Sequence, residues 1–231
     1  MALTEGHRKI IDIFLQEQNI VDLYKSYHWN DDNWQNGFPE IFQLEKEISK
    51  AARNNSLGRD HLKMIADWGR LRNKKRISWR EPRSIQFYVN NSPAEWLEKE
   101  PEKVIQMLDD QIVGFGPTYC SKILHFAVPV IFGALDSRLV RTFGKGAKRY
   151  PLLNLKATRS KTGGSITKQA RWPGEFNTWI SVLNYFARTL NEQGKQCPHP
   201  PNYLQTGLRV KGVWLPADVE TALFSYTYKE A

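Results

Sequence analysis

Apolar residues recur at three- and four-residue spacing along most of this chain, which is the period of an α-helix with one buried face. The pattern is clearest over residues 7–27 and 39–53, and each of these segments is predicted to be an amphipathic helix. Prolines at first-turn positions and capping residues mark the start of others. Further helices are predicted at 59–71, from Ser92, and at 100–110, 117–127, 136–143, 174–193 and 216–227.

Strand signals are few, so the predicted fold class is all-α: a two-lobed helical bundle. Residues 85–89 are the one strand candidate, and a single short run cannot make a sheet. At 231 residues the chain is predicted to be a single unit. We expect one lobe from 1–90 with 174–231, a second from 91–145, and a basic connecting segment over 145–173. Residues 195–213 are expected to form a non-helical linker.

Composition narrows the class of protein. A content of 41% hydrophobic and 25% charged residues is typical of a globular protein. No stretch approaches a membrane span, and the first residues lack the layout of a secretion signal. We therefore expect no membrane partner and a cytoplasmic location, nucleoid-associated in a bacterium or nuclear in a eukaryote, and a monomer. Cys197 and His199 have the spacing of half a metal site that nothing completes, so neither metal nor cofactor is expected.

The net charge of +9 is concentrated in two segments. Residues 70–83 hold seven basic residues against one acid, and residues 144–172 hold eight with no acid. A localised basic surface favours a polyanion such as nucleic acid as partner.

The chemically informative segment runs from Ile112 to Phe126. Gly114 and Gly116 are predicted to form a tight turn, and Pro117 to begin the helix that follows. Free backbone amides at a helix start form a ready phosphate site.

This segment resembles the helix-hairpin-helix element of the DNA glycosylase superfamily, which includes endonuclease III and the 8-oxoguanine glycosylases. In that superfamily an apolar–Gly–apolar–Gly hairpin precedes a helix, and a catalytic aspartate opens the next helix about twenty residues later. Val113-Gly114-Phe115-Gly116 followed by Leu135-Asp136-Ser137 shows that order, and the resemblance covers roughly residues 100–145. It implies a DNA glycosylase acting on double-stranded DNA from which a base is flipped out.

The resemblance implies that Asp136 is the catalytic carboxylate. A carboxylate stabilises the positive charge that builds on deoxyribose as the base–sugar bond breaks. Asp136 also suits a helix N-cap. Bifunctional members carry a lysine nucleophile two residues after the hairpin, where this chain has Thr118, so hydrolytic base release is expected. Lys122, one turn later, is a second catalytic candidate. It could be a nucleophile that gives AP-lyase activity, a residue that contacts the base in the pocket, a phosphate contact or a solvated helix lysine, and these alternatives stay open.

The remaining candidates follow from how such an enzyme grips DNA. A flipped base must be held between flat or apolar side chains, for which Tyr119, Trp29 and Trp34 are the candidates. The expected DNA contacts are Gly114, Phe115, Gly116, Thr118, Arg138, Arg141, Lys161 and Lys168.

Two other functions remain open. One is a non-catalytic helix-hairpin-helix DNA-binding module in which Asp136 is only a cap; the other is an RNA-binding factor that uses the basic loop. The sequence does not identify the base that is excised. Base-excision repair and antiviral defence against modified phage DNA both fit.

Overall fold

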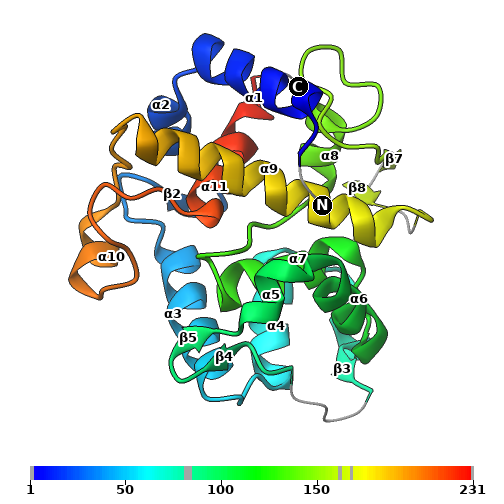
Figure 1. The fold of residues 1–231 in the computed structure, drawn as a ribbon. Helices are drawn as coiled ribbons and strands as arrows, with labels where there is room; N and C mark the ends of the chain where they lie inside the picture. Colours follow the sequence, from blue (N-terminus) through cyan, green and yellow to red (C-terminus); the bar gives the residue numbers. More distant parts are fainter. Residues whose placement is uncertain (1–2, 81–84, 161–162, 167–168, 230–231) are drawn as a thin grey trace.

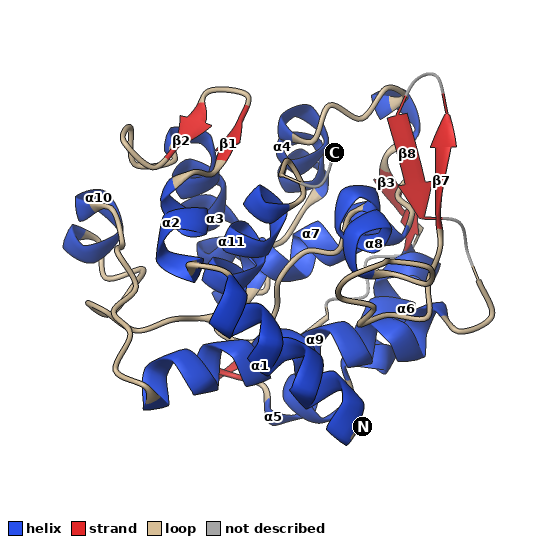
Figure 2. Cartoon of the chain, turned by 90° about the horizontal axis from the view of Figure 1, so that it is seen from above, coloured by secondary structure: helices blue, strands red, loops and turns tan. Residues whose placement is uncertain are grey.

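The computed structural model describes residues 3–80, 85–160, 163–166 and 169–229, and most of these are helical (Figures 1 and 2). The fold is therefore α-rich, as predicted. The helices described are α1 (Glu5–Glu17), α2 (Ile20–Lys25), α3 (Pro39–Arg53), α4 (Arg59–Trp68), α5 (Glu95–Lys99), α6 (Pro101–Gln111), α7 (Pro117–Ala127), α8 (Ser137–Phe143), α9 (Trp172–Glu192), α10 (Pro201–Gln205) and α11 (Pro216–Tyr226), with a 3-10 turn at Lys74–Arg76.

Short antiparallel strand pairs connect the helices in the structure, although the sequence predicted almost no strands. They are β1 (His28–Trp29) with β2 (Asp32–Asn33), β3 (Ser78–Trp79) with β6 (Ile112–Val113), β4 (Tyr88–Val89) with β5 (Ser92–Pro93), and β7 (Ala157–Ser160) with β8 (Gly163–Ile166). The predicted basic loop over 144–172 thus contains the β7–β8 hairpin. Such hairpins carry too few apolar alternations to be recognised from sequence.

Three predicted boundaries are wrong. The helix expected over 7–27 is two helices, because Asn19 caps α2 by accepting from the backbone amides of Val21 and Asp22. The helix expected from Ser92 begins at Glu95, because Ser92 pairs with Val89 instead of capping. The expected linker over 195–213 contains α10.

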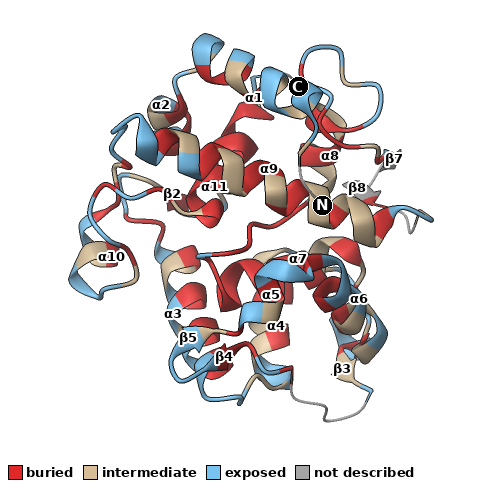
Figure 3. Ribbon diagram, in the orientation of Figure 1, coloured by how far each residue is buried: buried red, intermediate tan, exposed pale blue. Residues whose placement is uncertain are grey.

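The core is organised around α11, every residue of which is buried (Figure 3). This helix packs on α2 and α9, while α3 and α4 pack on α7, and α6 packs on both α7 and α9. In Figure 1 the helices α3 to α7 gather below α9, α1, α2 and α8 lie above it, and α11 passes behind it. Helices α3 and α4 were predicted to share a lobe with the C-terminal segment. In the structure they contact α7, which belongs to the other predicted lobe. The division into two lobes stays a prediction.

A buried ion network fixes the C-terminal segment to α3. The Nε of Arg209 donates to Asp218 Oδ1 at 2.9 Å, and its Nη2 donates to Glu45 Oε2 at 2.9 Å. All three side chains are at most 3% exposed. Ions this deeply buried are tolerated only when they are paired. Separating the pairs would leave buried unpaired charges, so the network holds residues 208–218 in place.

Among the residues described, no helix has the length and apolar character needed to cross a membrane.

Candidate functional site

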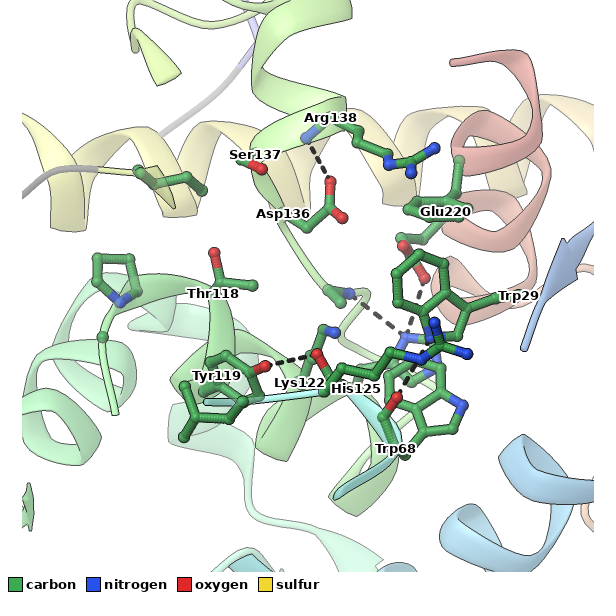
Figure 4. A pocket seen from close by; sticks show the side chains of 18 of the residues that line it. Trp29, Trp68, Thr118, Tyr119, Lys122, His125, Asp136, Ser137, Arg138 and Glu220 are labelled. Atoms are coloured by element: carbon green, nitrogen blue, oxygen red, sulfur yellow. Dashed lines mark hydrogen bonds and ion pairs between the residues drawn. The ribbon is translucent and has the colours of Figure 1, made fainter. Parts of the chain in front are cut away.

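A cavity of about 830 Å³ opens between the N-terminus of α8, the α4 C-terminus and helices α7 and α11 (Figure 4). Several residues that the sequence singled out separately line this one cavity. They are Trp29, Gly116, Thr118, Tyr119, Lys122, Asp136, Arg138 and Arg141.

Asp136 caps α8 and lines the cavity at the same time. Its Oδ1 accepts from the backbone amides of Arg138 at 2.7 Å and Leu139 at 3.0 Å. Both cap bonds end on Oδ1, which leaves Oδ2 outside the cap. The side chain is only half-buried. A cap and a chemically available carboxylate oxygen therefore coexist in one residue.

Lys122 is buried in the cavity wall, which excludes the interpretation of a solvated helix lysine. Its Nζ lies 4.5 Å from the centre of the Trp68 ring and 5.2 Å from that of Tyr119. Burial lowers the pKa of Lys122, although the charges of Asp136 and Glu220 act in the opposite direction. The amine is thus easier to deprotonate than that of a surface lysine.

Glu220 on α11 and His125 on α7 line the same cavity. Neither was predicted to be a site residue. Glu220 Oε2 lies 3.3 Å from His125 Nδ1, and both side chains are buried. Burial raises the pKa of Glu220, against a smaller lowering effect of His125. The signal available in the sequence was an acidic residue in the middle of the mostly apolar helix predicted over 216–227.

Aromatic rings form one side of the cavity. The indole N–H of Trp29 donates to Trp68 O at 3.3 Å, and the indole N–H of Trp68 donates to buried Asp32 at 2.9 Å. The Tyr119 hydroxyl donates to Gly69 O at 2.6 Å. Burial and the charge of Asp136 raise the pKa of Tyr119 to about 12, so this hydroxyl stays protonated. Because each ring is anchored by its polar atom, flat faces are held in fixed positions.

The glycine turn lies beside the cavity and against the first basic segment. Gly114 adopts a φ of +87°, and a Cβ there would lie 3.2 Å from Arg76 O. The strand pair β3–β6 and the hydrogen bond from Arg80 N to Gln111 O at 2.7 Å join residues 76–80 to this turn. The sequence segments 70–83 and 112–116 are therefore neighbours in space.

Basic residues from two separate segments of the chain line the cavity. Arg70 and Arg72 contribute from the α4 C-terminus, and Arg138 and Arg141 contribute from α8. Arg138 and Arg141 also line a second cavity of about 590 Å³, together with Lys148 and Arg149. The guanidinium of Arg138 lies 4.6 Å from the Tyr228 ring centre and 5.7 Å from that of Trp29. Positive charge thus continues from one cavity to the next.

Some predicted site residues lie elsewhere. Trp34 is not among the residues that line the cavity; its indole N–H donates to Pro198 O at 2.6 Å. The Phe115 side chain is buried against Tyr119, so only its backbone remains available for contact. Lys161 and Lys168 lie outside the described residues.

Cys197 and His199 do gain a third neighbour, Asp218, with ligand atoms within 4.8 Å of one another. Asp218 already accepts from Arg209 Nε and from Leu215 N at 3.0 Å, and His199 Nε2 lies 2.8 Å from Val213 O. These groups already have partners in the fold, and we assign no metal to them.

In comparisons with known proteins, no family model, curated protein or solved structure matches this chain.

Proposed function

We propose that this protein is a DNA glycosylase that releases a damaged or modified base, with Asp136 as the catalytic carboxylate. The observation that carries the proposal is the position of Asp136: a half-buried carboxylate at a helix start, in the same cavity as Lys122 and the rings of Trp29 and Tyr119.

The cavity supplies what base release needs. Stacking faces hold an extruded base, and Asp136 Oδ2 stabilises positive charge on the sugar at the opening. The arginines that line the cavity attract the flanking phosphates. The cavity volume of about 830 Å³ lies in the range of small-molecule binding pockets.

Asp136 acts together with water in this proposal, because Thr118 offers no amine at the position where bifunctional relatives of the resembled superfamily carry lysine. Thr118 lines the cavity all the same. Hydrolysis then leaves an abasic site with the strand intact.

The test is incubation of the protein with a panel of genomic DNAs, including DNA from phages with modified bases, followed by mass spectrometry of the released bases. We expect one class of base to appear, and D136N to lower the rate by about 10²-fold or more. Asn still accepts the α8 amides, so D136N should fold and bind DNA as the wild type does.

A matched control is D60N, which changes an exposed acid in the first turn of α4 that does not line the cavity. D60N should release base at the wild-type rate. Absence of base release from every DNA, with DNA binding retained, would favour the non-catalytic binding module.

A further inference from the structure

Two polar contacts converge on one nitrogen of His125. The backbone N–H of Ala134 donates to His125 Nδ1 at 3.3 Å, and Glu220 Oε2 lies 3.3 Å from the same atom. A nitrogen that accepts from a backbone amide carries a lone pair and no proton of its own. The neutral imidazole of His125 therefore has its proton on Nε2.

This tautomer fixes the state of Glu220. An ionised carboxylate has only lone pairs, and placing one against the lone pair of Nδ1 in a buried site would be repulsive. A protonated carboxyl instead directs its O–H at Nδ1, whose single lone pair is then shared between this O–H and the Ala134 amide, each at 3.3 Å. The burial that raises the pKa of Glu220 acts in the same direction.

Burial favours a neutral Glu220 more strongly than any neighbour, and among the neighbours His125 and Lys122 act in the opposite direction, whereas Asp136 acts with burial. The groups that face it are Lys122 and His125 on α7, Asp136 before α8, and Tyr27 after α2. The Lys122 amine lies over the Trp68 and Tyr119 rings, and the ion-pair contact recorded for Glu220 is with His125. Asp136 adds a second negative charge close by, which disfavours ionisation of Glu220.

We propose that Glu220 is a neutral carboxylic acid that holds His125 through Oε2 and presents Oε1 to the cavity, where it accepts a hydrogen bond from an N–H of the bound base. Oε1 is then an uncharged acceptor beside aromatic rings, which suits the N–H edge of a heterocycle and disfavours an anion at that depth. Phosphates belong at the arginines that line the cavity, among them Arg138, which follows Asp136 (Figure 4). The role rests on the proposed glycosylase function for the identity of the ligand.

Glutamine is the informative substitution, because its amide reproduces a protonated carboxyl: the N–H₂ donates to His125 and the carbonyl oxygen faces the cavity. E220L keeps similar bulk and removes both groups. We expect E220L to lower kcat/KM for base release about 10- to 100-fold relative to E220Q. The pH profile of the wild type should fall on the alkaline side as Glu220 ionises, and E220Q should lack that limb. Equal losses in E220Q and E220L would overturn the proposal.

Infrared spectroscopy decides the protonation state without any activity. The difference spectrum between the wild type and E220Q at neutral pH should show the C=O stretch of a protonated carboxyl, and H125Q should shift it. A carboxylate band in its place would overturn the proposal even if bases are released. If no DNA yields a base, the proposed function and the base-reading role both fail, whereas the infrared result still decides whether Glu220 is neutral.

Discussion

The amine of Lys122 lies over the faces of two aromatic rings, 4.5 Å from the centre of Trp68 and 5.2 Å from the centre of Tyr119. These rings come from α4 and α7, and each is tied in place by its own hydrogen bond. Burial removes the water that would solvate the charged amine, and this lowers the pKa of Lys122 from its ordinary value. This arrangement gives the first two predictions.

The stability of the protein should depend on the protonation of Lys122. Its pKa in the folded state is lower than in the unfolded state, so the unfolded chain takes up the proton first as the pH falls. The stabilising contribution of the neutral amine is complete above the unfolded pKa and is lost as the pH falls through the folded pKa. Thermal melts across pH should show a steeper loss of Tm on acidification for the wild type than for K122M. Parallel curves for the two proteins would contradict this.

Borohydride should trap no covalent adduct between Lys122 and DNA, because base release is proposed to use water and Asp136. The measurement is denaturing gel electrophoresis after reduction of a reaction that releases base. An adduct that disappears in K122Q, and persists in K63Q on the α4 surface, would show that Lys122 is a nucleophile and that hydrolysis is the wrong mechanism.

The two glycines of the turn should respond differently to alanine. G114A places a side chain at a φ of +87° and 3.2 Å from Arg76 O, so we expect a loss of about 1–2 kcal/mol in the free energy of unfolding. Gly116 has a negative φ and nothing within 4 Å of the added Cβ, so G116A should cost less than about 1 kcal/mol. Urea denaturation of both variants measures the difference. Equal losses would show that the turn is not constrained at Gly114.

The salt dependence of DNA affinity should report the arginines at the opening. If Arg70 and Arg138 each contact a phosphate, R70Q and R138Q should each reduce the slope of log Kd against log salt by about 0.9. Arg188 on α9 pairs with Glu192 and lines neither cavity, so R188Q serves as the matched control. Fluorescence anisotropy with a labelled duplex measures all three, and a slope as small for R188Q as for the other two would contradict the assignment.

Removing the centre of the buried ion network should destabilise the fold. R209M leaves the carboxylates of Glu45 and Asp218 buried without their cation, and the expected cost is about 3–5 kcal/mol. Chemical denaturation gives the value. Replacing all three residues by apolar ones of similar volume should recover much of the loss, whereas a cost below 1 kcal/mol for R209M alone would show that water reaches the site.

The periodicity of the sequence was sufficient to predict several of the helices. Residues 39–53 and 117–127 are helices over the predicted ranges, because an apolar stripe and a first-turn proline are both encoded within the segment. The capping role of Asp136 was also visible, since a cap depends only on the residues that follow it. The short strand pairs were missed because the pattern of apolar residues does not show which segments pair. The break at Asn19 was missed because a capping side chain does not change that pattern.

The composition of the site was decided by tertiary packing. Trp29 and Trp34 are indistinguishable in sequence, yet only Trp29 lines the cavity, because Trp68 O accepts one indole N–H and Pro198 O the other. The sequence could show that Lys122 and Glu220 are ionisable but not that both are buried, since their desolvation comes from helices distant in the chain. Local patterns therefore determine where many helices begin and which residues can cap them. The neighbours and the protonation state of a side chain depend instead on which distant segments pack around it.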